Sequence, residues 1–64
     1  MISVNGREEK FLKETVDMLL QRLDVEPRGI AVAIDGEIVR RDEWSSTLVV
    51  DECSIEIVTA AAGG

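Results

Sequence analysis

The stretch Ile30-Ala31-Val32-Ala33-Ile34-Asp35-Gly36-Glu37-Ile38-Val39 predicts a β-hairpin in the middle of the chain. Bulky branched residues alternate with alanine over 30–34, which is the period of two of a strand with one bulky and one small face. Asp35-Gly36 tolerates the positive φ angles of a two-residue type I′ turn. The return strand is expected at 37–39. A hairpin with one apolar face needs a second layer to cover it.

A second hairpin of the same kind is expected at the start of the chain. Ile2-Ser3-Val4 alternates apolar and polar residues, and Asn5-Gly6 again suits a type I′ turn. The return strand should lie within residues 7–12, with Phe11 or Leu12 as its inward side chain.

One amphipathic helix is expected between the two hairpins. Apolar residues recur there at i, i+3, i+4 and i+7 and form a single stripe of Val16, Leu19, Leu20 and Leu23. Thr15 is the expected N-cap, because its hydroxyl can accept a hydrogen bond from a free N–H of the first turn. Pro27 and Gly29 close the segment, and Met18 lies off the stripe, where it could be exposed.

The last ten residues begin as a strand and then change character. Ile55 and Ile57 alternate with polar neighbours, whereas from Thr59 onward every residue is small and uncharged, up to Gly63-Gly64. Six such residues reach roughly 20 Å when fully extended. We therefore expect a single domain over residues 1–64 with a flexible C-terminal tail over 59–64.

Together these elements predict an α+β fold in which one helix packs on one face of a mixed sheet of four or five strands. Trp44 is expected to close an end of the core, with its indole N–H near the surface. The apolar run at 47–50 is too short to assign, and Asp51-Glu52 should turn the chain into the final strand.

Composition narrows the function. Thirteen acidic against seven basic residues give a net charge of −6, which disfavours nucleic acid as a partner and favours basic protein surfaces. No apolar run approaches 18 residues and no secretion signal is visible, so we expect no membrane partner. The lone Cys53 fits a reducing cytosol and hence a cytoplasmic protein. Histidine is absent, so the commonest general base and metal ligand is missing, and we expect neither an enzyme nor a metal site.

Two further features are expected to be structural. Cys53 has no histidine anywhere in the chain to activate it, so we expect a small, partly buried turn residue rather than a sulfur-carrying thiol. The acidic pairs Asp42-Glu43 and Asp51-Glu52 diverge along the backbone and should form a solvated rim that could meet a basic partner.

The whole chain resembles the ThiS family of bacterial thiamine-biosynthesis sulfur carriers. The resemblance is carried by Val4-Asn5-Gly6, Thr15-Val16 with Leu19-Leu20, the segment 31–39, Glu43-Trp44, Ile55-Glu56-Ile57-Val58 and the Ala-rich link to Gly63-Gly64. The chain departs from the family pattern at Arg40, where proline is frequent, and at 51–53, where an Asp-Gly-Asp turn is usual. Both departures fall in loops.

The resemblance implies the ubiquitin-like β-grasp fold and a carrier role. In that family an E1-like adenylating enzyme of the ThiF type adenylates the terminal glycine, here Gly64, and a sulfur-relay cysteine desulfurase supplies sulfur for a thiocarboxylate. A thiazole synthase of the ThiG type receives that sulfur. The residues that would thread the partner's active site are Ala60, Ala61, Ala62 and Gly63. The chain itself would bind no cofactor, since ATP belongs to the adenylating enzyme.

Other functions remain open from the residues alone. A ubiquitin-like modifier conjugated to proteins also needs an activated glycine, and so does a carrier for molybdopterin synthesis. A β-grasp binding module would not need the Gly63-Gly64 end.

Overall fold

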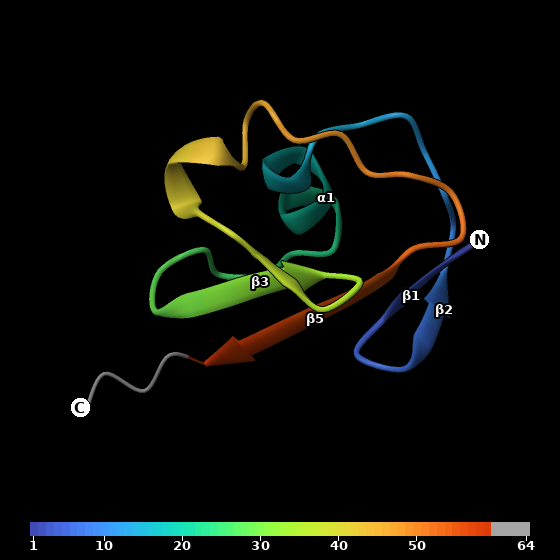
Figure 1. The fold of residues 1–64 in the computed structure, drawn as a ribbon, viewed down its shortest axis with the longest axis horizontal. Helices are drawn as coiled ribbons and strands as arrows, with labels where there is room; N and C mark the ends of the chain where they lie inside the picture. The colour runs from blue at the N-terminus through green and yellow to red at the C-terminus, as the bar shows by residue number, and fades with distance from the viewer. Residues whose placement is uncertain (60–64) are drawn as a thin grey trace.

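The computed structural model describes residues 1–59, which contain five strands, one α-helix and one short 3₁₀ helix. In chain order these are β1 (Ile2–Val4), β2 (Arg7–Glu9), α1 (Val16–Arg22), β3 (Ile30–Ile34), β4 (Glu37–Val39), η1 (Arg41–Glu43) and β5 (Ser54–Thr59). Figure 1 shows the helix over the sheet, with β5 crossing its middle. The predicted order of hairpin, helix, hairpin and final strand is confirmed.

The described strands form one mixed sheet in the order β2-β1-β5-β3-β4. The last strand, β5, is therefore the central one. It runs parallel to β1, with Ser3 opposite Ser54, and antiparallel to β3, with Ile30 opposite Thr59. The two hairpins thus flank β5 on either side.

Both hairpin turns have the predicted geometry. Asn5 and Gly6 have φ angles of 52° and 83°, and Asp35 and Gly36 have φ angles of 50° and 86°. Two successive residues in the left-handed region are the mark of a type I′ turn, whose twist matches that of the strands it joins.

The first return strand lies within residues 7–12, as predicted. It ends at Glu9, so the inward side chain that the sequence placed within the strand comes from the loop after it. Phe11 is partly buried and packs against the core from that loop, while Leu12 is exposed.

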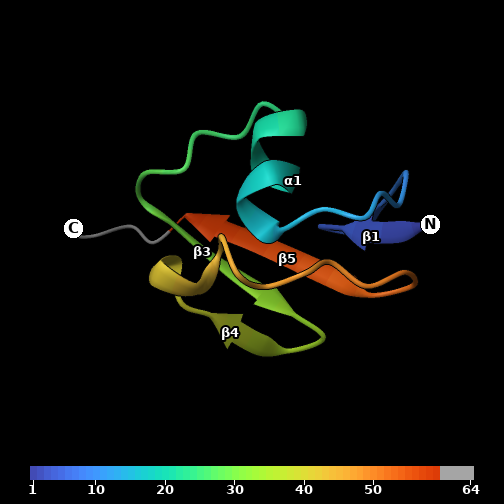
Figure 2. The ribbon, with the colours of Figure 1, turned by 90° about the horizontal axis from the view of Figure 1, so that it is seen from above.

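α1 lies over one face of the sheet (Figure 2), and the buried residues of both elements form the core between them. The predicted helical stripe faces inward, with Val16, Leu19 and Leu20 buried and Leu23 partly buried, whereas Met18 is 53% exposed. The other buried hydrophobic members of the core are Ile2, Val4, Val32, Trp44, Val49, Cys53 and Ile55.

The start of α1 is closed differently from the prediction. Thr15 occupies the N-cap position, but its hydroxyl donates to the carboxylate of Asp17 instead of accepting from the backbone. The first helical N–H groups are satisfied from elsewhere in the chain: Val16 N donates to Thr47 O at 3.0 Å and Asp17 N to Trp44 O at 3.3 Å. Carbonyls from a distant segment therefore accept the hydrogen bonds that a local N-cap side chain would otherwise accept.

This segment, residues 44–50, also explains the unassigned apolar run. It forms no strand: Leu48 makes an isolated bridge with Thr15, and only Val49 of the run points into the core. Trp44 is 5% exposed and belongs to the core, and its indole N–H makes a partly buried hydrogen bond to the carbonyl of Val39 at 3.0 Å. A buried indole N–H needs such a partner.

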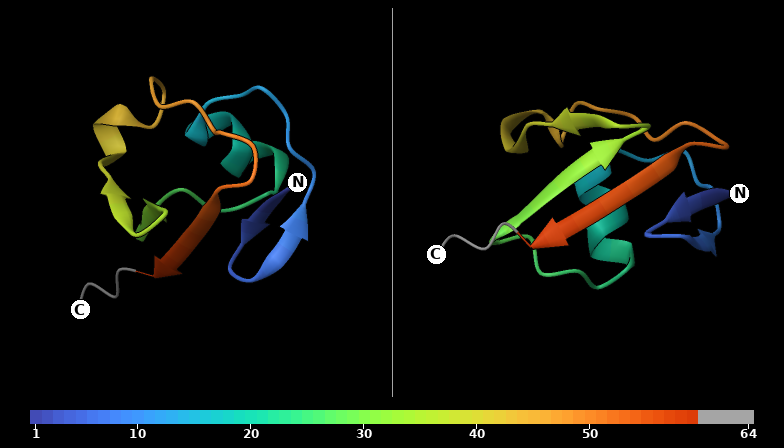
Figure 3. Two further views of the ribbon diagram at one scale, coloured as in Figure 1. Left: turned by 45° about the vertical axis from the view of Figure 1, so that its right-hand side comes forward. Right: turned by 60° about the horizontal axis from the view of Figure 1, so that its bottom comes forward.

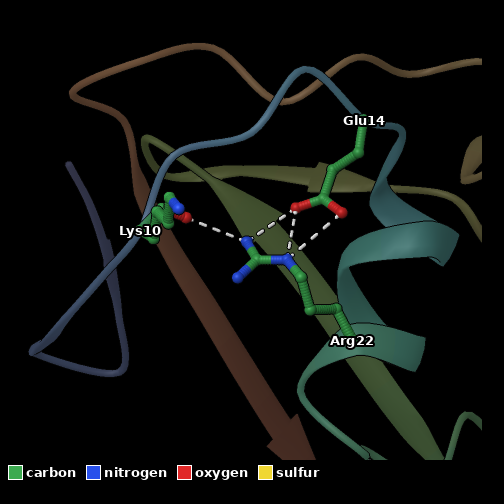
Figure 4. A network of polar contacts seen from close by, with 3 residues as sticks. All are labelled: Lys10, Glu14 and Arg22. Carbon is green, nitrogen blue, oxygen red and sulfur yellow. Dashed lines mark hydrogen bonds and ion pairs between the residues drawn. The ribbon is translucent and has the colours of Figure 1, made fainter.

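One ion pair joins the β2–α1 loop to the far end of α1 (Figure 4). Glu14 is 7% exposed and is the buried charged residue of the described chain. Arg22 donates from Nη2 to Glu14 Oε2 at 2.7 Å and from Nε at 3.0 Å, and Nη2 also reaches Lys10 O at 2.9 Å. The hydrogen bond to this carboxylate raises the pKa of Arg22, so the guanidinium stays charged. The pair fixes the loop against the helix.

Candidate functional site: the end of the central strand and the open sheet face

The end of β5 is paired on its β3 side as far as Thr59, but its backbone pairing with β1 stops at Ile55. The sequence predicts a tail that starts at Thr59. In the structure Thr59 is the last residue of β5 and pairs with Ile30, so the boundary between strand and tail lies one residue later. Residues 60–64 lie outside the described residues. The predicted site residues Ala60, Ala61, Ala62, Gly63 and Gly64 are therefore not located, and their roles stay predictions.

Two turn side chains fasten β5, one toward each end. Asn5 Oδ1 accepts from Ile57 N at 2.8 Å, and Asn5 Nδ2 donates to Ile57 O at 3.1 Å. Asp35 Oδ1 accepts from Ser54 N at 2.9 Å, while Asp35 N donates to Ser54 O at 2.7 Å. From the sequence, Asn5 and Asp35 are expected only to form turns. Their polar side chains are the signal that could have suggested a second role, although not the partner.

The sheet has an open face on the side away from α1 (Figure 3, right), where β3 and β5 pass in front of the helix. Side chains alternate between the two faces of a strand, so Ala31 and Ala33 of β3 lie on this open face. Their paired residues Val58 and Ile38 lie on the same face, which gives it a small and apolar centre. Ile38 is 69% and Val58 57% exposed. We call Ala31, Ala33, Ile38 and Val58 the apolar patch.

Acidic residues accompany the apolar patch on the same face. Glu56 pairs with Ala33, and Glu8 pairs with Ser3 two strands away; both glutamates are exposed. Exposed apolar side chains beside unburied charges are typical of a protein-binding surface.

Cys53 is more deeply buried than predicted, and it belongs to the core cluster. Burial raises the pKa of its thiol, because the thiolate would lose its hydration. A protonated, enclosed thiol is a poor nucleophile.

The acidic pairs at 42–43 and 51–52 are exposed, as expected of a rim. Asp51 accepts a hydrogen bond from the Met1 ammonium at 2.8 Å, which lowers the pKa of Asp51. Within residues 1–59 no group of acidic, cysteine or histidine side chains is arranged to hold a metal ion. Nor is any described helix long and apolar enough to cross a membrane.

A five-stranded mixed sheet in this order, with one helix on one face, is a ubiquitin-like β-grasp domain. Residues 2–64 match the model of the ThiS family, and the chain belongs to that family. It is 39% identical over 51 residues to the sulfur carrier protein ThiS of Escherichia coli K12. The aligned residues cover 80% of this chain and 77% of that protein. The predicted family and fold are confirmed.

Solved structures agree with this assignment. The crystal structure of the thiamine biosynthesis protein ThiS from Geobacter metallireducens has a TM-score of 0.85 at 27% identity and covers 98% of this chain and 97% of its own. An NMR solution structure of a thiamine biosynthesis protein from the same organism has a TM-score of 0.72 at 26% identity, covering 89% and 78%.

Proposed function

We propose that this chain is a sulfur carrier of thiamine biosynthesis and that the carboxyl group of Gly64 carries the sulfur. The observation that carries the proposal is the family match, which runs over residues 2–64 and so includes the glycine pair. The fold supports it, since the strand leading to these residues is the central one of the sheet. Residues 1–64 would act as one domain, with 60–64 as the working tail.

The chemistry would proceed on the partners. A carboxylate is a poor electrophile, so one of its oxygens first attacks the α-phosphorus of ATP in an E1-like adenylating enzyme of the ThiF type, and pyrophosphate leaves. A cysteine-desulfurase relay would deliver the sulfur as a protein persulfide, whose terminal sulfur forms a C–S bond as the C–O bond to AMP breaks. A thiol would then reduce the resulting acyl disulfide, which releases the thiocarboxylate and leaves a disulfide between that thiol and the relay cysteine. The carbon keeps its oxidation level.

The product thiocarboxylate would donate its sulfur to a thiazole synthase of the ThiG type. An acyl-adenylate must be kept from water, which requires a closed channel around the reacting end. Small residues at 60–64 suit such a channel, and glycine adds freedom in φ. ATP would be bound by the adenylating enzyme, so the carrier needs no cofactor and is a substrate rather than an enzyme.

The apolar patch is the proposed docking surface for the adenylating enzyme. Ile38 and Val58 project from the sheet, and Glu56 lies beside them on a chain with a net charge of −6. The complementary surface is an apolar contact bordered by lysine and arginine side chains. Charges of this kind chiefly raise the rate of association.

Mass spectrometry tests the proposal. The chain incubated with its adenylating enzyme, ATP and a sulfur source should gain the mass of one oxygen-to-sulfur exchange. Deletion of Gly64 should abolish the gain, and Cys53→Ser should leave it unchanged. A gain of one whole sulfur atom in place of the exchange, kept by the truncated chain and lost with Cys53→Ser, would place the sulfur on the thiol.

The same spectrum separates the other functions. An isopeptide adduct to lysine of another protein would establish a conjugated modifier. Transfer of sulfur to a molybdopterin precursor in place of thiazole would establish the other carrier class. A complex with no ATP-dependent product would leave a binding module.

A further inference from the structure

Asn5 extends the pairing of β5 beyond the point where β1 ends. The main chain of β1 follows β5 as far as Asn5, whose N–H donates to Ile55 O at 2.9 Å. The positive φ of 52° at Asn5 then turns the backbone away toward β2. If β1 continued as a parallel strand, its next backbone hydrogen bonds would be to Ile57. The turn directs those backbone groups away from β5.

The side chain of Asn5 supplies both of those bonds. Its Oδ1 accepts from Ile57 N and its Nδ2 donates to Ile57 O, so the side-chain amide stands where a peptide group would stand. The orientation of the amide is fixed, because a backbone N–H can only donate and a carbonyl can only accept. Aspartate has nearly the same shape but lacks the donor, and it would set a carboxylate oxygen against Ile57 O.

From these contacts we infer that Asn5 is a positioning residue for the reaction at the C-terminus. Without it, β5 beyond Ile55 would be held on its β3 side alone. With it, β5 is held on both sides at the level of Ile57, which stands opposite Val32 of β3 and lies two residues before the last described residue. The inference rests on the proposed function, because it concerns the presentation of the residues after β5 to the adenylating enzyme.

Asp35 provides a matched control within the same fold. It occupies the equivalent place in the other type I′ turn, has a similar φ of 50°, and also binds β5 with its side chain. Its partner is Ser54, the first residue of β5, at the end away from the tail. Loss of either side chain removes hydrogen bonding to the same strand, but only Asn5 acts at the end that leads to residues 60–64.

The experiment compares Asn5→Gly with Asp35→Gly in the full-length chain. Glycine keeps the positive φ without strain and removes the side chain. Amide hydrogen exchange by NMR follows Ile57 and Ser54, and ATP–pyrophosphate exchange with the cognate adenylating enzyme gives KM and kcat. Urea unfolding of both variants shows how much of any change is a loss of stability.

For Asn5→Gly we expect faster exchange of the Ile57 amide and a rise in KM of about fivefold, which corresponds to about 1 kcal/mol of net hydrogen bonding. The value of kcat at saturation should stay the same, because the bound end reaches the same geometry. Asp35→Gly should speed exchange at Ser54 and leave KM within about twofold. Asn5→Asp should raise KM at least as much as Asn5→Gly.

Equal changes in KM for Asn5→Gly and Asp35→Gly would show a merely structural role and overturn the inference. So would an unchanged KM, or unchanged Ile57 exchange, in Asn5→Gly while the wild-type chain is active. A wild-type chain that supports no ATP–pyrophosphate exchange overturns the proposed function and this inference together, so the two failures are distinguishable.

Discussion

Replacement of Leu20 by alanine tests the packing of the helix on the sheet. Leu20 is 2% exposed and lies on the inward stripe of α1. The change removes three carbon groups, each with a transfer free energy of about 0.8 kcal/mol, and leaves a cavity in an enclosed site. We therefore expect a loss of about 3 kcal/mol in the free energy of unfolding. A domain of this size has roughly 3–10 kcal/mol in total.

Urea unfolding followed by fluorescence measures the loss, because Trp44 is the only tryptophan of the chain and is buried. The midpoint should fall while the slope m stays the same, since the surface exposed on unfolding hardly changes. Met18→Ala is the matched control in the same helix. Met18 is largely exposed, so its free energy of unfolding should change by no more than about 0.5 kcal/mol.

A loss below about 1 kcal/mol for Leu20→Ala at unchanged m would refute the packing argument, because no enclosed leucine is removed so cheaply. A Met18→Ala loss as large as that of Leu20→Ala would mean that the buried stripe has been assigned to the wrong face of α1.

Three further predictions follow from the contacts. Glu14→Gln should lower the free energy of unfolding by about 1–3 kcal/mol, because Arg22 loses its charged acceptor, while Glu26→Gln in the exposed pair with Arg28 should have little effect in the same urea assay. Burial raises the pKa of Cys53, so the stability that the protonated thiol confers is complete below the unfolded pKa of about 8.5 and is lost as the pH rises through the folded value. The urea midpoint should accordingly fall above about pH 9, and a Cys53→Ala chain with the same fall would contradict that cause. Ile38→Asp should weaken binding to the adenylating enzyme, whereas Met18→Asp, on the helix, should not. Equal effects of the two variants would exclude the apolar patch as the docking surface. In stopped-flow binding, added salt should slow association more than it speeds dissociation.

The parts of the fold that the sequence predicts correctly are those decided by neighbouring residues. Asn5-Gly6 and Asp35-Gly36 specify their turns because few other pairs accept two successive positive φ angles. The leucine stripe specifies the buried side of α1 because helical period alone sets which residues share a face. These features need no knowledge of the rest of the chain.

The features that could not be predicted depend on residues far apart in sequence. The capping of α1 by carbonyls of residues 44 and 47 replaced a local cap that Thr15 could have supplied. The bond from Asn5 to Ile57 spans 52 positions, and no local pattern indicates it. In the sequence Glu14 is an ordinary charged residue of a polar link. In the structure it is buried and paired with Arg22, which lies eight positions further along the chain. The reactive end at Gly64 stays a prediction.

The position of β5 would link the two requirements of the proposed activation at the chain end, which are docking and presentation of that end. Val58 contributes to the apolar patch, and on the same strand Ile57 is held by Asn5. β5 therefore carries part of the proposed docking surface and also leads to residues 60–64, and a hairpin flanks it on either side. On the proposed function, a partner docked on the open face would also hold the end of β5 in place, and with it the point from which residues 60–64 start.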